Sequence, residues 1–500
     1  MQKMRFFRRC LPLFLAFWLL LAVAGAPFAA YAGESVTVRD SSGQVCYAAP
    51  MDPENACPAL QSALDTVRSG AYGTCTVTVT PGEYRMTKSA VLASDMTLNL
   101  TGVTLLNDNA GKGNIFISPN RDRTGKDYTG YSALENCTLR GGTLDYAPGN
   151  TNGSCLLRLA HCKNVTVDGT AFLNNKDSHH AELAAGYNVR FVNCLFSGQT
   201  NQTESSAEAL QIDILEKNRH FANFPAYDGT MNQKITVEDC TFQDLICGVG
   251  TRNAFAGRYQ KGVTIRGNTF RRLQGTAIVC TNYVDAVIEK NTITDCGRGV
   301  AYYMCKNSGV TDVFTDGSGK VLGKRNTDCG SRITDNTISV CQTAEMDKPR
   351  GMFLYGGKAT GKMPAGNYAV YNLTVSGNTI TTTGGGITGT DLQNCTLADN
   401  RITHTGAAAE TTVGILLHGS SGNLIEKNTC TALHNGLKCM DASHSNELRS
   451  NTVTNSRSSA VCIVDSNGVE VTENTIRTGA TNGIFAVSYT HLRAHETAAN

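Results

Sequence analysis

Five polar residues between positions 180 and 252 could carry chemistry together: His180, Glu182, Gln211, Asp213 and Arg252. Two carboxyl groups can serve as acid and base in glycoside hydrolysis. An arginine, or Ca²⁺ held by the two carboxylates, could instead neutralise a uronate carboxylate and acidify the neighbouring proton, which a base such as His180 would remove in a lyase reaction. Hydrogen bonds alone could bind a glycan without catalysis, so three functions remain open.

The strands that carry these residues open on Gly or Ala and continue with an apolar residue, as in Gly299-Val-Ala and Gly386-Ile-Thr. Alternate residues of a strand face opposite sides. The apolar second residue therefore predicts the inner face, and the opening, third and fifth residues are predicted on the outer face. This alignment gives the catalytic candidates His180, Glu182, Asp213 and Arg252, and the substrate-binding candidates Gln211, Tyr303, Phe353 and Tyr355.

Stacking of the strands determines the spacing of the two carboxyl groups. Neighbouring strands lie ~4.8 Å apart, which predicts Glu182 next to Gln211. Asp213 would then lie diagonal to Glu182, at roughly 7–8 Å. Inverting glycosidases hold their two carboxyl groups roughly 6.5–9.5 Å apart to admit a water molecule.

The same residues also permit a purely structural interpretation. The polar cluster could be a solvated ladder with one Asp-Arg ion pair, which would contribute only ~0–1 kcal/mol. The aromatic candidates could stack on sugar rings, or they could pack under the long inserts at 306–330 and 342–368. The charged residues gather on three consecutive strands beside a polar excursion at 216–231, which favours a site.

Repeats organise most of the chain. A marker asparagine in motifs such as Lys290-Asn-Thr-Ile293 recurs at intervals of 23, 45, 42, 22, 28, 23 and 23 residues. The markers are Asn268, Asn291, Asn336, Asn378, Asn400, Asn428, Asn451 and Asn474. One repeat of about 22 residues indicates a solenoid. Each doubled interval is expected to hide a further coil whose marker has changed or whose loop has grown.

Short strands flank each marker, and no segment between them has a helical period of useful length. A repeat with two or three strands and no helix predicts an all-β fold, the parallel β-helix. The marker asparagines are expected to adopt the left-handed backbone of a sharp turn. Their side chains would then form a hydrogen-bonded ladder between coils.

The first 32 residues have the features of a secretory signal peptide, with three arginines, an apolar stretch from Leu11 to Val23 and a small-residue cleavage site at Ala30-Tyr-Ala32. Its removal takes away four positive charges and leaves 40 basic against 42 acidic residues. A nearly neutral chain does not indicate nucleic-acid binding, and no later stretch is long and apolar enough for a membrane span. We expect a secreted or surface-displayed monomer.

The chain contains nineteen cysteines. Cys137, Cys194 and Cys240 occupy marker positions and are predicted to be small, buried ladder residues. Cys305 and Cys329 flank a polar insert, where secretion would permit a disulfide. The cysteine and histidine spacings do not indicate a zinc site.

Residues 59–67 have the apolar spacing of a short amphipathic helix, and a strand with Pro81-Gly-Glu-Tyr84 follows. This passage resembles the opening of the pectate-lyase superfamily, in which a helix covers the first coil of a right-handed parallel β-helix. The resemblance implies a capping segment at 33–75 and a right-handed β-helix at 76–486. Residues 487–500 break the repeat and resemble a translated sequencing adapter.

A second resemblance covers the polar cluster. His180-Ala-Glu-Leu183, Glu208-Ala-Leu-Gln-Ile-Asp213 and Gly248-Val-Gly-Thr251 are similar to secreted β-helix repeat proteins of Gram-positive gut bacteria. A histidine is expected in that group where this chain has Arg252. The superfamily includes lyases, hydrolases, epimerases and adhesins, so the resemblance leaves activity open. It implies an extracellular polysaccharide partner, which could contain uronate sugars.

Overall fold

The computed structural model describes residues 36–111, 113–150, 154–176, 178–199, 208–217, 221–251, 253–305, 313–360, 362–407, 409, 412–477, 481–487 and 492–495. The predicted signal peptide lies outside these residues. Within the described part of the chain, no helix has the length and apolar character needed to cross a membrane.

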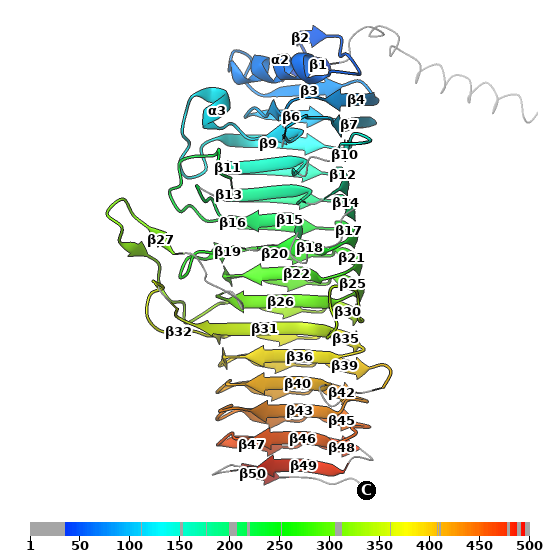
Figure 1. The fold of residues 1–500 in the computed structure, drawn as a ribbon, viewed down its shortest axis with the longest axis vertical. Coiled ribbons are helices and arrows are strands. Elements are labelled where there is room, and N and C mark those ends of the chain that lie inside the picture. Colours follow the sequence, from blue (N-terminus) through cyan, green and yellow to red (C-terminus); the bar gives the residue numbers. More distant parts are fainter. Residues whose placement is uncertain are drawn as a thin grey trace, which may run out of the picture.

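Parallel strands stack coil upon coil along one long axis (Figure 1). Residues one repeat apart in the sequence are therefore neighbours in space. A fourteen-stranded sheet forms one side of the stack. Its strands are β4 (Gly82–Met86), β7 (Val103–Asn107), β10 (Thr143–Tyr146), β12 (Ala171–Asn175), β14 (Leu195–Gln199), β17 (Thr241–Leu245), β21 (Thr269–Leu273), β25 (Thr292–Cys296), β30 (Thr337–Val340), β35 (Thr379–Thr382), β39 (Arg401–His404), β42 (Thr429–Thr431), β45 (Thr452–Thr454) and β48 (Thr475–Arg477). This architecture is the predicted parallel β-helix.

The second sheet contains two series of strands. One series follows the Gly- or Ala-opening motif: β11 (Leu157–Asp168), β13 (Ala181–Val192), β15 (Glu208–Asp213), β18 (Cys247–Gly250), β22 (Thr276–Thr281), β26 (Arg298–Met304), β31 (Arg350–Lys358), β36 (Gly385–Thr390), β40 (Val413–His418), β43 (Asn435–Met440), β46 (Ser459–Val464) and β49 (Asn482–Val487). The other precedes the turn before β4 and its successors: β3 (Cys75–Val79), β6 (Met96–Asn99), β9 (Leu134–Arg140), β16 (Gln233–Glu238), β20 (Thr264–Arg266), β24 (Val287–Glu289), β29 (Arg332–Thr334), β34 (Thr374–Ser376), β38 (Thr396–Ala398), β41 (Leu424–Glu426), β44 (Glu447–Arg449), β47 (Val469–Thr472) and β50 (Leu492–His495). Helix α3 (Arg121–Thr124) and the short strands β5 (Ala90–Val91), β8 (Phe116–Ile117), β19 (Gln260–Lys261), β23 (Tyr283–Val284), β27 (Phe314–Thr315), β28 (Val321–Leu322), β32 (Asn367–Tyr368), β33 (Val370–Tyr371) and β37 (Leu392–Gln393) lie in or beside the loops.

The first coil is covered by a helix, as predicted. Helix α2 (Cys57–Arg68) buries Leu60, Ala63 and Leu64, which recur at helical spacing. Strands β1 (Val36–Asp40) and β2 (Val45–Ala49) pair antiparallel, and β1 also pairs antiparallel with β3. These elements protect the apolar core and the strand edges that an open end would expose.

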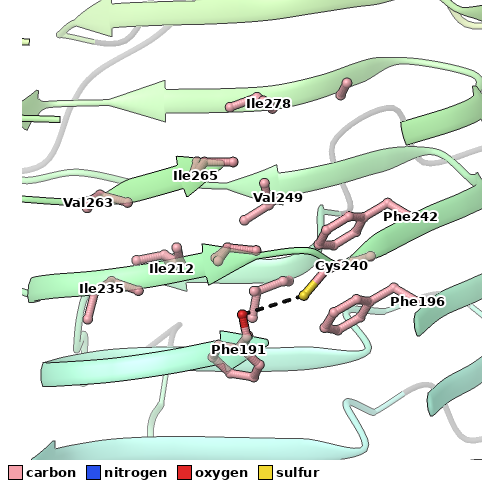
Figure 2. Packing of buried hydrophobic residues seen from close by; sticks show 14 of the residues in the cluster. Phe191, Phe196, Ile212, Ile235, Cys240, Phe242, Val249, Val263, Ile265 and Ile278 are labelled. Atoms are coloured by element: carbon pink, nitrogen blue, oxygen red, sulfur yellow. Dashed lines mark hydrogen bonds between the residues drawn. The ribbon is translucent and has the colours of Figure 1, made fainter. Parts of the chain in front are cut away.

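The interior is a dry stack of equivalent side chains. The rings of Phe172, Phe196, Phe242 and Phe270 stack at centroid distances of 4.8, 4.7 and 4.8 Å along the fourteen-stranded sheet. Figure 2 shows Phe196 and Phe242 in this stack beside the thiol of Cys240, which donates to the Phe191 carbonyl at 3.5 Å. Parallel coils in register therefore build both the core and the outer surface from ladders of equivalent positions.

The stack predicts a measurable stability loss when one ring is removed. The change Phe196→Leu should lower the free energy of unfolding by about 1–3 kcal/mol, because each aromatic pair contributes about 0.5–1.5 kcal/mol beyond its buried area. Denaturant unfolding of the purified protein measures this loss. Phe485→Leu is the control, because Phe485 is 40% exposed; equal effects of the two changes would contradict the prediction.

The predicted asparagine ladder is confirmed. From Asn268 to Asn451, each marker amide donates to the side-chain oxygen of the next marker at 2.9–3.0 Å. The prediction that the marker asparagine itself has a left-handed backbone is wrong, however. The residue before the marker adopts it, as at Lys290 and Asp399, both with φ of 55°. The asparagine is thereby free to point inward and bond along the stack.

Within the described residues the doubled marker intervals contain longer loops and no hidden coil, so the prediction of a further coil in each interval is wrong. Asn291 donates directly to Asn336, and Asn336 donates directly to Asn378. The extra residues project from one side of the stack, where Figure 1 shows β27 and β32. Further down, β50 pairs parallel with β47, so the backbone continues the repeat at 492–495, where the sequence predicted an interruption.

The cysteines in the described part of the chain form no disulfides. Cys194 and Cys240 are buried on the ladder, and the Cys194 amide donates to the Cys240 sulfur at 3.4 Å. Cys305 and Cys329 are also buried but form no disulfide with each other, so the disulfide that the sequence permitted there is not formed. Cys305 packs in a small cluster under the 356–368 loop, whereas Cys329 lies in the main core.

Candidate functional site

The outer wall is the outward face of the strands β11, β13, β15, β18, β22, β26, β31, β36 and β40. Leu183 and Ile212 belong to the main core, so the residues that alternate with them face outward. Glu182 pairs in register with Gln211, and Ala184 pairs with Asp213. The predicted diagonal arrangement of Glu182 and Asp213 is therefore confirmed.

The opening position of each strand faces inward, which corrects the predicted alignment. A Cβ atom at Gly386 would lie 2.6 Å from the core side chain of Ile402, so this position needs a very small residue. His180 occupies the same position and is fully buried. Its Nε2 lies 3.1 Å from the Ser197 carbonyl oxygen, and its ring meets Phe196 edge-on. Burial lowers the pKa of His180 to about 4, so the ring is neutral and does not face a ligand.

Glu182 is held by an arginine that the sequence did not single out. Arg158 on β11 pairs in register with Glu182, and its Nε lies 2.5 Å from the carboxylate. Burial by itself would raise the pKa of Glu182, but the charges of Arg158 and His179 outweigh it and keep the pKa below its ordinary value of 4.5. Glu182 is therefore ionised at neutral pH.

Asp213 has the opposite electrostatic environment. Burial raises its pKa to about 8; hydrogen bonds from Asn253 oppose this rise, and the charges of Glu208 and Glu182 add to it. The amide nitrogen and side chain of Asn253 donate to the carboxyl at 3.0 and 3.2 Å. At neutral pH Asp213 is thus largely protonated.

Gln211 lies between the two carboxyl residues along the wall. It is 1% exposed, and its side-chain nitrogen makes no hydrogen bond within the described residues. A buried donor without an acceptor costs about 1–3 kcal/mol. Such a group suits a site whose ligand supplies the acceptor.

Arg252, the fourth predicted catalytic residue, lies outside the described residues. Three other residues complete the cluster: Arg158, His179 and Glu208. His179 Nδ1 lies 2.6 Å from the Glu208 carbonyl oxygen, and the Glu208 side chain is 2% exposed. The inward turn at the opening position is the reason that His179, and not His180, borders the outer wall. A sequence alignment that allowed for this turn could have found His179 and Glu208.

A loop covers part of this cluster. Phe221 and Phe224, from the predicted excursion at 216–231, pack on Ala160 and Ala184 of the outer wall. The guanidinium carbon of Arg158 lies 5.5 Å from the Phe221 ring centroid. The polar cluster is consequently enclosed and is not the solvated ladder of the structural alternative.

The three aromatic candidates meet further down the same wall. Tyr303 on β26 lies 6.0 Å from Phe353 and 6.4 Å from Tyr355, both on β31, measured between ring centroids. Phe353 is 8% exposed, while the two tyrosines are half-buried. Five strand spacings of ~4.8 Å separate Glu182 from Phe353 in the register, or roughly 24 Å. Both groups therefore lie on the same outer wall.

A cleft of about 670 Å³ begins at Tyr355. Its lining includes Lys358, Asp391, His418 and Asp441. His418 Nε2 lies 2.7 Å from the Asp441 carboxylate, and burial raises the pKa of Asp391 while the charges of Lys358 and His418 oppose this. The two aspartates lie in the turns just after β36 and β43, outside the strand positions that were aligned in the sequence.

The residues do not favour the calcium alternative. Among the described residues, no three His, Cys, Asp or Glu side chains gather closely enough to hold a metal ion. The Arg158 guanidinium already contacts the Glu182 carboxylate and would compete with a cation. The carboxyl pair fits acid and base roles better than a calcium-ligand role.

The stacked parallel coils with an enclosed polar cluster on their outer wall define a β-helix with a candidate functional site. Residues 226–363 and 326–498 match the family described as "Right handed beta helix region", and the chain belongs to this family. The right-handed parallel β-helix predicted from the sequence is thereby confirmed. Membership of the pectate-lyase superfamily stays a prediction.

Solved structures support the same fold. PfbA, a surface adhesin of Streptococcus pneumoniae, has a TM-score of 0.53 at 17% identity, with 85% of this chain and 89% of that chain covered. A mutant tailspike protein of E. coli bacteriophage HK620 in complex with a pentasaccharide has a TM-score of 0.52 at 16% identity, covering 93% and 86%. A search of curated proteins finds no match. At these identities the likeness establishes the fold alone.

Proposed function

We propose that this protein is an extracellular β-helix that hydrolyses a polysaccharide, with Asp213 as acid and Glu182 as base. One observation carries the proposal: two carboxyl groups lie diagonally on neighbouring strands, and their pKa values move in opposite directions. Environments that separate the pKa values of two carboxyl groups assign the acid and the base. The diagonal spacing of roughly 7–8 Å leaves room for a water molecule between them.

The reaction follows from these two protonation states. Asp213 gives its proton to the glycosidic oxygen as the bond from that oxygen to the anomeric carbon breaks. Glu182 takes a proton from water, whose oxygen forms the new bond to the anomeric carbon on the opposite face. Arg158 positions the Glu182 carboxylate, and Gln211 can donate to a sugar hydroxyl between the two groups. This geometry predicts inversion at the anomeric carbon.

An extracellular location fits the predicted signal peptide and the kind of ligand. The fold is shared with a surface adhesin and with a tailspike protein that holds a pentasaccharide. A β-helix wall offers a long, straight surface that suits a polymer better than a small molecule. We expect the glycan to lie along the outer wall from the carboxyl pair to the aromatic residues.

Binding without hydrolysis is the second candidate, and the burial of the carboxyl pair favours it. Glu182 is 7% and Asp213 is 1% exposed, whereas Tyr303 and Tyr355 are half-buried and face outward. A ligand could stack on these rings without reaching the carboxyl groups. This function is that of an adhesin, with affinity and no turnover.

A panel of neutral and uronate-containing polysaccharides separates these functions. New reducing ends without unsaturated sugars would identify a hydrolase, and unsaturated ends that absorb ultraviolet light would identify a lyase. Binding without product, retained after Glu182→Gln and Asp213→Asn, would identify an adhesin. Because Arg158 occupies the Glu182 carboxylate, we expect product formation to survive EDTA unchanged. A loss restored by Ca²⁺ would contradict the acid and base assignment.

A further inference from the structure

Two arginines lie beside each other on the outer wall, next to the aromatic residues. Arg298 on β26 and Arg350 on β31 are partners in register. Their guanidinium carbons lie 5.2 and 5.0 Å from the Phe353 ring centroid. Each cation therefore stacks with the same aromatic ring, and the planes of the side chains are held in place.

Neither arginine forms an ion pair with a residue in the part of the chain that the structure describes. Arg298 donates to the Tyr303 hydroxyl at 3.4 Å and contacts the Met346 sulfur at 3.5 Å, and its Nε is buried with no acceptor among the described residues. Burial and the charge of Arg298 lower the pKa of Arg350, while Tyr303 and Asp347 oppose this. The pair thus retains unused donors and mutual repulsion.

This arrangement differs from that of two arginines elsewhere on the second sheet. Arg266 contacts Glu238 at 2.7 Å, and Arg449 contacts Glu426 at 2.8 Å, each on a neighbouring strand. Like charges opposite each other on neighbouring strands are destabilising, and the chain avoids them at those positions. A ligand anion would relieve the repulsion between Arg298 and Arg350 and accept from their free donors.

We infer that Arg298 and Arg350 form a subsite for an anionic substituent, a carboxylate or a sulfate, of the glycan on the outer wall. The inference rests on the proposed function and adds the charge class of the glycan. The rings of Tyr303 and Tyr355 would pack against sugar faces while the planar guanidinium groups bind the anion through paired hydrogen bonds. The subsite selects the polymer, and the carboxyl pair cleaves it.

Binding to three polymers tests the subsite: polygalacturonic acid for carboxylate, dextran sulfate for sulfate, and dextran as the neutral polymer. The double variant Arg298→Gln/Arg350→Gln should lose about 10- to 100-fold in affinity for one acidic polymer. The control Arg271→Gln/Arg401→Gln removes the same charge from exposed positions on the fourteen-stranded sheet and should change affinity less than about twofold. The acidic polymer whose binding weakens in this variant shows whether the subsite binds carboxylate or sulfate.

Each of the other possible outcomes would overturn the subsite, the proposed function or both. Equal losses in both double variants would show attraction to overall charge and no subsite. Unchanged acidic-polymer binding, together with loss of binding in Tyr355→Ala, would remove the subsite and leave the proposed function. No binding of wild type to any polymer would overturn both. Thermal unfolding of each variant without ligand serves as a folding check, and removal of the repelling pair should not lower the melting temperature.

Discussion

Replacement of Asp213 by asparagine should lower kcat for polysaccharide hydrolysis by about 10²- to 10⁴-fold, because the leaving oxygen loses its proton donor. Glu182→Gln should produce a loss of similar size, because the attacking water loses its base. Release of reducing ends at saturating polysaccharide measures both. The isosteric changes keep the hydrogen-bonding shape of the site, so KM should change much less than kcat.

Glu238→Gln is the matched control for these variants. Glu238 is also a carboxyl residue on the second sheet that binds arginine, with Arg266 at 2.7 Å, but it lies on β16 and not on the outer wall. Its replacement should leave kcat unchanged. Full activity in Asp213→Asn would remove Asp213 from the reaction, and an equal loss in all three variants would indicate general damage to the fold.

The pH profile gives an independent check of the two roles. Activity should fall as the pH rises through about 8, where Asp213 loses its proton, and should persist below pH 4.5 until Glu182 is protonated. The pKa of Asp213 in the folded protein lies above its ordinary value of 3.8, so the protonated carboxyl stabilises the fold. This contribution to the free energy of unfolding is fully present below pH 3.8 and is lost as the pH rises from about 4 through 8. Asp213→Asn should therefore be more stable than wild type at pH 8, although it is inactive. For a catalytic carboxyl, the same substitution raises stability and lowers activity. If Asp213 were only structural, the substitution would change stability without this loss of activity.

Periodicity predicted the fold well because each coil repeats one local rule. An apolar strand, a left-handed turn residue and an inward asparagine recur about every 22 residues, and tertiary packing repeats the same contacts in each coil. The N-terminal helix at 57–68 also followed from its local apolar spacing. Register then placed Glu182 beside Gln211 without any long-range information.

The candidate site was harder to predict, because its environment depends on residues that break the local rule. The opening position turns inward against the fourteen-stranded sheet, which buried His180 and brought His179 to the outer wall. Arg158 precedes the motif that identified the other residues, so only the pairing of β11 with β13 brings it to Glu182. The covering contacts of Phe221 and Phe224 come from a loop without periodicity, and burial determines both carboxyl pKa values.

Asn400→Asp should be strongly destabilising, with a loss of about 4 kcal/mol or more in the free energy of unfolding. The Asn400 amide donates to the Val375 carbonyl and to Asn428 Oδ1, both at 2.9 Å, and its oxygen accepts from the amide nitrogen and side chain of Asn378. An aspartate keeps the acceptor but loses both donations, and it places a carboxylate beside the Asn428 oxygen at a site that is 1% exposed. Each unsatisfied buried group costs about 1–3 kcal/mol, and more when it is charged.

The same substitution at Asn164 separates ladder burial from asparagine chemistry. Asn164 also bonds along the stack, to Asn136 at 3.0 Å and from Asn188 at 2.8 Å, but its side chain is exposed on the outside of β11, where its backbone is left-handed with a φ of 55°. Water replaces the lost donor there, and aspartate tolerates the left-handed backbone of this residue, so Asn164→Asp should cost less than about 1 kcal/mol. Denaturant unfolding of both variants at pH 7 compares them directly. Equal losses of unfolding free energy in Asn400→Asp and Asn164→Asp would contradict the prediction. The inward ladder would then owe its stability to side-chain shape and would not depend on a continuous chain of buried amides.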